Sequence, residues 1–410
     1  MRKSSNWRQL IAGACALAAL GAGAEAAATP EGGGFARWLK AFRVEALAEG
    51  VSPQTFDTAF AGVEVVDRVT EANDSQPEFS RPFWAYLDGA AGPARVERGL
   101  TRQSEQTALL RSIAQSYGVD ASVIAAIWGL ESNYGAILGD YDVIAALATL
   151  AYDSRRTDYG RAQLLGALQI LDRGYANKAQ LKGSWAGAMG QTQFIPTTYL
   201  SYAVDHDGDG RRDVWSNYGD VFASTANYLS KSGWTLGRPW GFEVTLPDGF
   251  AYAEADLSEK RSTAYWARSG VRRPDGETLT RDASLLNSQS SIIVPTGAGG
   301  PAFIVFDNFR AILRYNNSTA YALGVGMLAD ALSGDPFELV RDWPRGETPL
   351  SRTERVALQE ALARRGFNPG DADGILGART RAAIRAFQKT QGMPQDGYAT
   401  HEILRRLTAS

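Results

Sequence analysis

The stretch VIAAIWGLESNYG, residues 123–135, combines an apolar helical pattern with one acidic residue near its end. Ile124, Ile127, Trp128 and Glu131 follow i, i+3, i+4, i+7 spacing, which puts Glu131 on the apolar face. Burial beside indole and aliphatic groups disfavours a charged carboxylate, so we expect a raised pKa for Glu131. Such a group suits a general acid working near neutral pH. Glu131 is therefore the candidate catalytic residue, and a solvated glutamate in the last helical turn is the alternative.

Helical periodicity continues on both sides of this stretch, whereas strand patterns are scarce. The pattern predicts helices over 35–49, 100–117, 120–131, 140–151, 160–173 and 219–231. Short β-rich runs bounded by Gly or Pro predict strands at 243–246, 291–294 and 302–306. The sequence therefore predicts a mainly α (α+β) fold with a small β element.

Composition narrows the classes of protein that the chain can belong to. Its 410 residues are 44% hydrophobic and 21% charged, as expected for a folded protein of two or three domains. A net charge of −3 gives no global attraction for nucleic acid, which is not an expected partner. One cysteine and two distant histidines, His206 and His401, argue against disulfides, zinc peptidases and serine peptidases. We expect no organic cofactor.

The N-terminus has the layout of a secretory signal peptide over 1–26. Basic residues precede an apolar run at 10–20, and a small-residue stretch follows with cleavage after Ala26 or Ala28. The run is too short to span a membrane, so the mature chain should have no transmembrane span. Too few apolar residues precede Cys15 for a lipid-anchored protein of the outer membrane. We expect export to a bacterial periplasm.

The other end of the chain differs in charge from the body. Residues 341–350 have the Pro and Gly punctuation of a linker. The following unit, 351–410, has ten Arg and Lys against six Asp and Glu, whereas 27–350 has 29 against 38. A small basic module behind an acidic body is typical of an anchoring domain, because tethering raises the local concentration of substrate.

Four motifs carry a resemblance to a known family. The segment 131–135, ESNYG, resembles the catalytic E-S-x-[FYW]-G signature of lytic transglycosylases and goose-type lysozymes. GSWAGAMGQTQFIPTTY, residues 183–199, resembles their second motif in the form typical of the lytic murein transglycosylase B family. The likeness continues through 203–229 and RYNNSTAYALGVG at 314–326. It implies a lysozyme-like helical catalytic domain over 27–340.

The family cleaves the β-1,4 bond between N-acetylmuramic acid and N-acetylglucosamine in peptidoglycan without adding water. The resemblance implies that Glu131 protonates the glycosidic oxygen and then takes the proton from the C6 hydroxyl, giving a 1,6-anhydro end. The substrate's own N-acetyl group can replace a second carboxylate. If water were used instead, Asp140 and Asp142 are the nearest second acids. A water-using muramidase and a non-catalytic peptidoglycan-binding protein remain the alternatives.

The resemblance also assigns the residues that would line the cleft. Ser184, Gln193 and Phe194 would contact the glycan near Glu131. The other positions that match the family's cleft are Tyr228, Tyr315, Asn316, Tyr321 and, by a looser alignment, Tyr86. From the residues alone, any one of these tyrosines is as well explained by packing.

Residues 205–213, DHDGDGRRD, resemble an EF-hand loop and predict a structural calcium or sodium ion. Asp205, Asp207, Asp209 and Asp213 occupy positions 1, 3, 5 and 9, with Gly at the sharp turn of position 6. Arg211 at position 7 would offer its backbone carbonyl. Position 12 is Ser216 rather than Glu, and in the family's longer loop Asp220 would supply the last carboxylate. A solvated acidic turn is the alternative.

The segment 351–410 resembles the peptidoglycan-binding module of many cell-wall hydrolases. Ala383, Ile384 and Phe387 form an apolar helical stripe, and Asp-Gly pairs mark turns between three short helices. The basic excess suits the carboxylates of stem peptides, and a helical dimerisation appendage is the alternative. We expect a monomer that binds peptidoglycan glycan strands, with cell-wall enzyme complexes as further partners.

Overall fold

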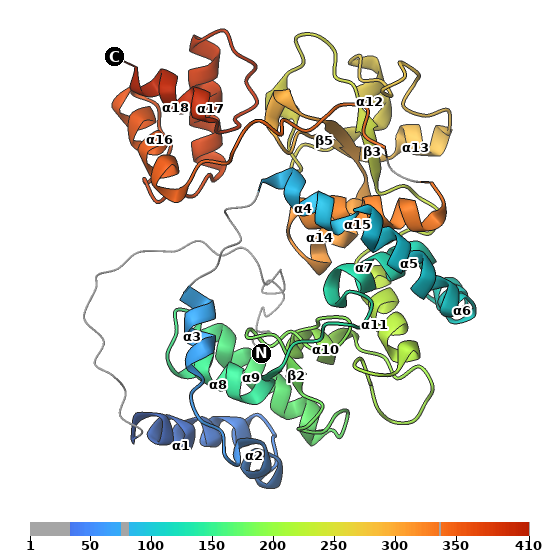
Figure 1. The fold of residues 1–410 in the computed structure, drawn as a ribbon, viewed down its shortest axis with the longest axis vertical. Coiled ribbons are helices and arrows are strands. Elements are labelled where there is room, and N and C mark those ends of the chain that lie inside the picture. Colours follow the sequence, from blue (N-terminus) through green and yellow to red (C-terminus); the bar gives the residue numbers. More distant parts are fainter. Residues whose placement is uncertain (1–32, 75–81, 336–337, 410) are drawn as a thin grey trace, which may run out of the picture. The chain divides into compact units, whose positions relative to one another are not determined.

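The computed structural model describes residues 33–74, 82–335 and 338–409, so the predicted signal peptide and Cys15 lie outside the described residues. These residues divide into two compact units, which we call the helical unit (33–74 and 93–232) and the mixed unit (82–92 and 233–409). Figure 1 labels most of the elements of each unit. No helix within the described ranges is long and apolar enough to cross a membrane.

The helical unit is built around one pair of helices. Its elements are α1 (Gly33–Ala48), α2 (Pro53–Phe60), α3 (Asp67–Asp74), α5 (Pro93–Glu105), α6 (Thr107–Tyr117), α7 (Ala121–Ser132), β1 (Tyr141–Asp142), α8 (Val143–Tyr152), α9 (Thr157–Asp172), β2 (Lys182–Gly183), α10 (Pro196–Tyr202) and α11 (Tyr218–Lys231). α8 is buried along nearly all of its length and packs against α9. They approach closely at Gly160, where a Cβ atom would lie 2.5 Å from the backbone nitrogen of Ala151. A helix that is apolar on all sides belongs in an interior, so α8 is central to this unit.

The predicted helices are present, with two local differences. The helix expected from residue 140 begins at Val143, because Asp142 caps it by accepting a hydrogen bond from the backbone of Ala145 at 3.1 Å. The single helix predicted over 100–117 is instead α5 and α6, separated at Gln106. At this break the hydroxyl of Thr107 donates to the carbonyl oxygens of residues 103 and 104. Such side-chain bonds compete with the helical backbone pattern.

The mixed unit contains the small β element. Its four-stranded antiparallel sheet has the order β3 (Gly241–Val244), β6 (Ala302–Val305), β5 (Gln289–Ile293) and β4 (Arg261–Ser262). Every residue of β3 and β6 is buried, which fits the continuous apolar run of β6, whereas β3 includes the buried Glu243. The unit also holds the helices α4 (Phe83–Ala90), α12 (Thr263–Arg268), α13 (Ala283–Asn287), α14 (Asp307–Tyr315) and α15 (Thr319–Ser333). The predicted strands and the mainly α fold class are thus confirmed.

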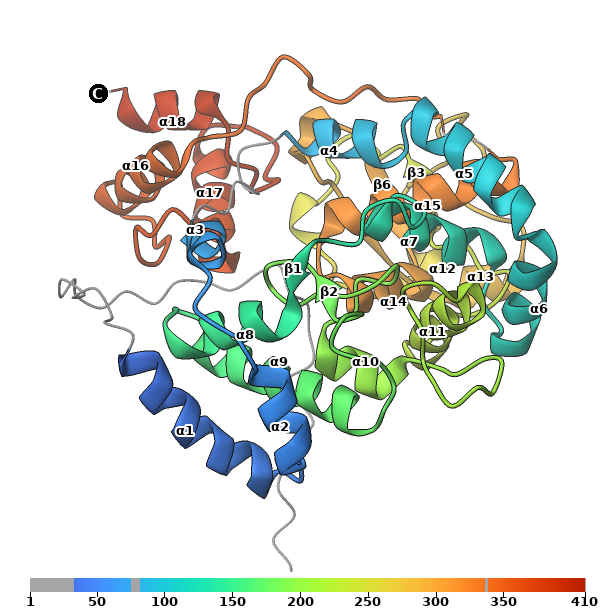
Figure 2. The same ribbon diagram turned by 60° about the horizontal axis from the view of Figure 1, so that its bottom comes forward.

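The last three helices, α16 (Arg352–Arg364), α17 (Ala378–Thr390) and α18 (His401–Thr408), surround a core of their own (Figure 2). Two Asp-Gly turns are each tied to a helix by a buried glutamine. The Gln359 side chain accepts from the backbone of Gly374 at 2.7 Å, and the Gln388 side chain accepts from that of Gly397 at 2.9 Å. Leu350, predicted as the end of the linker, packs into this core.

Candidate active site and acidic loop

Glu131 lies in the last turn of α7 and is half-buried. The helix ends at Asn133, which has a left-handed backbone with φ of 50°, and Tyr134 follows with φ of 59°. Ser132 is fully buried and its hydroxyl closes this end: it donates to the carbonyl of Trp128 at 3.1 Å and accepts from the backbone of Gly135 at 3.0 Å. The residues after Glu131 therefore hold the chain in a fixed, sharp turn.

The tyrosine of this turn explains a glycine inside α7. The ring of Tyr134 packs so closely on Gly129 that a Cβ atom there would lie 2.5 Å from the ring. The Tyr134 hydroxyl donates to the carbonyl of Arg95 at 3.2 Å, which joins the turn to α5. Burial raises the pKa of Tyr134 to about 12, so the hydroxyl stays protonated and remains a donor. Tyr134 is thus a packing residue of the turn.

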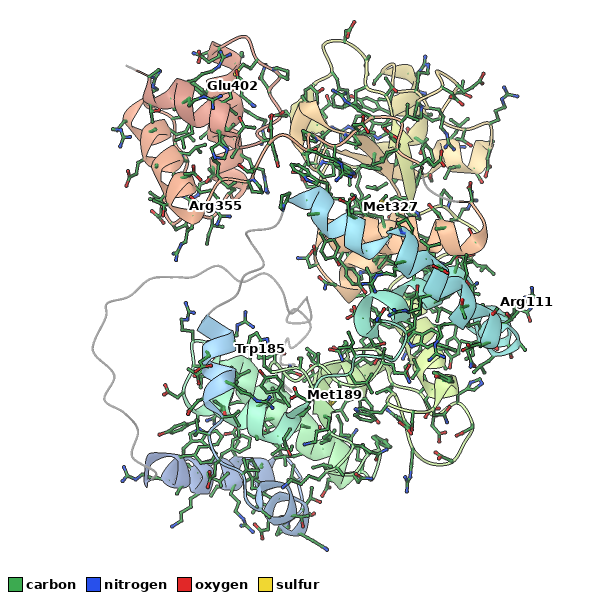
Figure 3. All side chains as sticks on the ribbon, in the orientation of Figure 1. Arg111, Trp185, Met189, Met327, Arg355 and Glu402 are labelled. Carbon is green, nitrogen blue, oxygen red and sulfur yellow. The ribbon has the colours of Figure 1, made fainter. Side chains whose placement is uncertain are left out.

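The loop 183–194 contains two tight turns. The Ser184 backbone donates to the carbonyl of Ala188 at 2.8 Å, and the Ser184 hydroxyl accepts from the backbone of Ala188 at 3.0 Å. Met189 pairs with Phe194, and between them Gln193 adopts a left-handed φ of 50°. Figure 3 labels Trp185 and Met189, which belong to this loop. Its small residues let the backbone fold tightly.

This loop lies against the segment that follows Glu131. The Gln193 amide donates to the carbonyl of Leu138 at 3.3 Å. A Cβ atom at Gly139 would lie 2.2 Å from the carbonyl oxygen of Gly183, and one at Gly135 would lie 2.5 Å from the side-chain oxygen of Gln191. The structure thus brings the first two predicted motifs together. Gln191 was not among the residues predicted from the sequence. The one sequence feature that could have indicated its importance is that it is a polar residue within a glycine-rich run.

The remaining predicted cleft residue of the helical unit, Tyr228, lies on α11 and is 6% exposed. Its ring stands 5.9 Å from that of Phe194, which is 2% exposed. The Tyr228 ring also packs on that of Tyr202, with the centroids 4.4 Å apart. Contact of Phe194 and Tyr228 with a ligand remains a prediction.

Four predicted cleft residues lie in the mixed unit. Tyr86 is on α4 and is 38% exposed. Tyr315 and Asn316 lie at the end of α14, and Tyr321 lies in the first turn of α15. The side-chain oxygen of Asn316 is buried and has no hydrogen-bond partner in the described part of the chain. A buried acceptor without a partner is costly, so this atom is suited to receive a hydrogen bond from a ligand.

The two acids considered as partners for Glu131 are engaged elsewhere. Asp140 is exposed and accepts a hydrogen bond from Arg68 at 3.0 Å, and this bond holds its pKa below the usual range. Asp142 caps α8. Both carboxylates thus make structural contacts of their own.

The acidic loop gathers part of the predicted ion site. Carboxylate oxygens of Asp205, Asp207 and Asp209 lie within 4.8 Å of one another. Asp205 accepts from the backbones of Gly208 and Gly210 at 2.7 and 2.8 Å, so the loop is folded around this carboxylate. Oxygen-only donors gathered in this way fit a hard cation such as calcium.

Asp213 and Asp220 stand outside that cluster of three. Asp213 accepts from the backbones of Trp215 and Ser216, both at 2.9 Å. Asp220 is fully buried and accepts from the backbones of His206 at 2.7 Å and Asp213 at 2.6 Å. Burial raises the pKa of Asp220 above its usual value. In this structure, Asp220 therefore joins the two ends of the loop.

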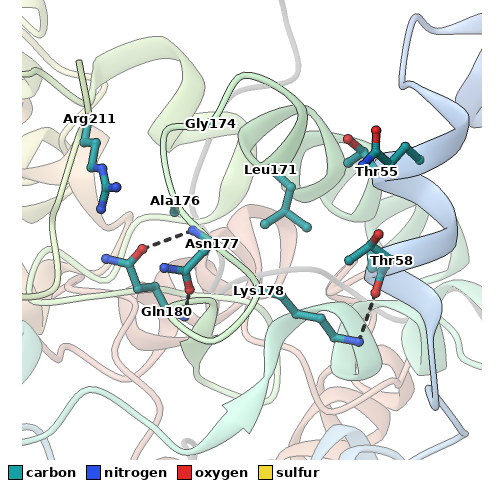
Figure 4. A pocket seen from close by; sticks show the side chains of 11 residues that line it. Thr55, Thr58, Leu171, Gly174, Ala176, Asn177, Lys178, Gln180 and Arg211 are labelled. Carbon is teal, nitrogen blue, oxygen red and sulfur yellow. Dashed lines mark hydrogen bonds between the residues drawn. The ribbon is translucent and has the colours of Figure 1, made fainter.

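A cavity of about 360 Å³ lies elsewhere in the helical unit (Figure 4). Of the predicted site residues, Arg211 alone is among those that line it. On its wall, the Lys178 ammonium donates to the carbonyls of Thr58 at 3.4 Å and Ala61 at 3.0 Å. Because Glu131 does not line it, this cavity is separate from the candidate active site.

Two family models match the chain. The model "Transglycosylase SLT domain" matches residues 34–330. The model "Putative peptidoglycan binding domain" matches residues 351–407.

Similar proteins agree with these models. Membrane-bound lytic murein transglycosylase B of Escherichia coli (strain K12) is 33% identical over 247 residues, which are 59% of this chain and 64% of that protein. SltB3 from Pseudomonas aeruginosa, crystallised in complex with NAG-anhNAM-pentapeptide, is 52% identical with a TM-score of 0.89, covering 92% of this chain and 100% of that one. The Escherichia coli lytic transglycosylase SLT35 in complex with calcium is 28% identical with a TM-score of 0.62. The match covers 72% of this chain and 92% of that one. The lysozyme-like fold prediction is thus confirmed. The chain belongs to the transglycosylase SLT domain family, in its lytic murein transglycosylase B branch, and carries a peptidoglycan-binding domain after the transglycosylase domain.

Proposed function

We propose that this protein is a lytic transglycosylase that cleaves the β-1,4 bond between N-acetylmuramic acid and N-acetylglucosamine in peptidoglycan. The observation that carries the proposal is Glu131, half-buried at a locked helix end, with the nearest acids, Asp140 and Asp142, engaged in other contacts. This arrangement is consistent with a single carboxyl group that serves as both acid and base. The anhydro sugar with which SltB3 was crystallised supports the same product class.

In the proposed reaction, Glu131 first gives its proton to the glycosidic oxygen as the bond from C1 breaks. The resulting carboxylate then takes the proton of the C6 hydroxyl, whose oxygen closes on C1 of the same sugar. The bond lost at C1 is replaced by the 1,6-anhydro bond, and Glu131 ends protonated as it began. Because the attacking hydroxyl belongs to the substrate, ring closure has the entropic advantage of an intramolecular step.

The remaining predicted cleft residues are proposed as glycan contacts. Ser184 and Gln193 belong to the loop that lies against the segment after Glu131. Asn316 offers a buried acceptor that a sugar hydroxyl or amide could satisfy. We assign the same role to Phe194, Tyr228, Tyr315, Tyr321 and Tyr86 on family resemblance.

Glu131→Gln tests the assignment, with Glu64→Gln as the matched control because Glu64 is exposed in the same unit. On purified sacculi, the wild type should release anhydro-ended fragments, which mass spectrometry finds lighter by one water than hydrolysis products. Glu131→Gln should lose at least about 10²-fold in turnover, since acid–base catalysis is worth that much. Hydrated ends would identify a muramidase instead. Undiminished turnover by Glu131→Gln would refute the role of this residue.

We further propose that the acidic loop holds a structural calcium ion through Asp205, Asp207 and Asp209. Their gathered oxygens support this, and SLT35 was crystallised with calcium. When bound, the ion would supply positive charge that offsets repulsion among the three carboxylates. Sodium, or a solvated turn without an ion, is the alternative.

For the location, we propose export to the periplasm through a signal peptide at 1–26, consistent with a peptidoglycan substrate. Cell fractionation of the full chain and N-terminal sequencing of the mature form would test it. A mature chain that still began at Met1 in the cytoplasm would contradict the proposal.

A further inference from the structure

We propose that Gln191 is a positioning residue for Glu131. Its side-chain amide ties the helix that carries Glu131 to the segment that follows the acidic loop. This inference deepens the proposed function and rests on the catalytic role of Glu131.

Gln191 is buried, at 4% exposure, and both the oxygen and the nitrogen of its side-chain amide form hydrogen bonds. Its oxygen accepts a hydrogen bond from the indole nitrogen of Trp128 at 2.6 Å, and its nitrogen donates to the carbonyl of Trp215 at 2.9 Å. The backbone nitrogen of Gln191 also donates to the carbonyl of Val214 at 2.8 Å. Three hydrogen bonds therefore meet at one residue and join α7, the loop 183–194 and the segment after the acidic loop.

Towards the active site, this amide touches the chain on both sides of Glu131. Trp128 lies one helical turn before Glu131 and is 1% exposed. Gly135, four residues after Glu131, packs directly on the Gln191 side-chain oxygen. A shift of the amide therefore displaces the segments before and after the catalytic carboxyl group together.

Away from the active site, the contacts of Gln191 lead into the acidic loop. Its partner Trp215 donates its backbone N–H to the carboxylate of Asp213, whose own backbone N–H donates to Asp220. Asp220 in turn holds the backbone of His206 at the start of the loop. The acidic loop and the Glu131 helix are thus connected by an unbroken series of hydrogen bonds that passes through Gln191.

The chemistry of the site explains why an amide stands there. The position needs one acceptor for the Trp128 indole and one donor for the Trp215 carbonyl, and glutamine supplies both. Glutamate retains the acceptor and opposes the carbonyl with negative charge. Methionine fills a similar volume but leaves both buried groups without a partner, which is costly in an interior.

The test compares Gln191→Met with Gln163→Met. Gln163 is the matched control because it lies on α9 in the same unit, and its buried amide oxygen accepts two hydrogen bonds from Thr197. Gln191→Met should lower kcat by about 10- to 100-fold with KM nearly unchanged, since misplacing a catalytic group costs this much. Gln163→Met should leave kcat within about 2-fold. Equal kcat values for the two variants would overturn the proposal.

A spectroscopic readout keeps the test informative if Gln191→Met folds poorly. In protein labelled with ¹⁵N-tryptophan, Trp128→Phe identifies the indole N–H resonance of Trp128. Gln191→Met should shift that resonance and speed its hydrogen exchange. Gln191→Glu retains the acceptor, so it should keep the resonance protected while kcat still falls because the Trp215 bond is lost. An unmoved, protected resonance in Gln191→Met would contradict the assigned geometry.

The Glu131→Gln result separates the two proposals. If Glu131→Gln is inactive and Gln191→Met retains full kcat, the positioning role fails and the catalytic role stands. If Glu131→Gln retains turnover, the proposed function itself fails.

Discussion

Asp330 should make the mixed unit less stable as pH rises. This residue of α15 accepts a hydrogen bond from the indole nitrogen of Trp240 at 2.9 Å. Trp240 lies tightly over the same helix, since a Cβ atom at Gly326 would lie 2.4 Å from its ring. Burial raises the pKa of Asp330 from 3.8 to about 7, although the Trp240 bond acts in the opposite direction. The folded protein therefore holds a proton that the unfolded chain releases.

The difference in the pKa of Asp330 between the folded and unfolded states determines how the free energy of unfolding changes with pH. Below pH 4 both states are protonated, so the neutral carboxyl group fits the site without penalty. Between about pH 4 and 7 the unfolded chain has released this proton while the folded state still holds it, so stability falls across this window and levels off once the folded state also ionises. About three pKa units correspond to about 4 kcal/mol, an upper limit because an ionised side chain can draw in water.

Thermal unfolding from pH 4.5 to 8.5 measures this effect in Asp330→Asn, with Asp248→Asn as an exposed control in the same unit. Asparagine still accepts from Trp240 but cannot ionise. The Tm advantage of Asp330→Asn over the wild type should be small near pH 4.5 and should grow to roughly 10 °C at pH 8. Asp248→Asn should follow the wild type throughout. Parallel curves for the wild type and Asp330→Asn across this range would refute the reasoning.

Three further outcomes are expected. In chelator-treated protein, calcium at about 100 times its Kd should add about 3 kcal/mol of stability, and Asp207→Asn should abolish most of the rise in Tm; an equal rise in both would contradict the ion site. Gly135→Ala should destabilise by more than about 1 kcal/mol and lower kcat, whereas Gly118→Ala, with a similar positive φ but no atom within 4 Å, should leave kcat unchanged. Phe387→Ala, in the core of the last three helices, should cost roughly 3–5 kcal/mol and weaken pull-down by sacculi; unimpaired pull-down would favour the dimerisation alternative.

Much of the secondary structure could be predicted from local sequence patterns. Alternating or continuous apolar runs bounded by Gly and Pro located β3, β5 and β6 to within a few residues. The polar and glycine residues after Glu131 predicted where α7 ends, and the left-handed Asn133 occupies that position. These features depend on backbone preferences that neighbouring residues set among themselves.

Other features depend on contacts that sequence spacing does not encode. The spacing of apolar residues predicted that Glu131 lies on the buried face of α7. The helix is in fact buried on nearly all sides from Val123 to Gly129, so it has no exposed face from which that buried face could be distinguished. The buried amide of Gln191 forms hydrogen bonds with Trp128 and Trp215, which lie 63 and 24 residues away in the sequence. Asp220 was expected to complete the ion site, and the sequence did not predict that it also accepts hydrogen bonds from two backbone groups of the loop. Tertiary packing decided the first of these cases, and tertiary hydrogen bonds decided the other two.

The capped start of α16 has a practical consequence for transplanting the last three helices onto another protein. Ser351 accepts from the backbone of Glu354, and the Glu354 carboxylate accepts from the backbone of Ser351, so the helix supplies its own first turn. Leu350, one residue earlier, fills the core together with Leu358 and Phe387. A graft that began at Ser351 would keep the helix cap but lack the Leu350 side chain, which would leave a cavity in this core. The portable wall-binding fragment therefore begins at or before Leu350.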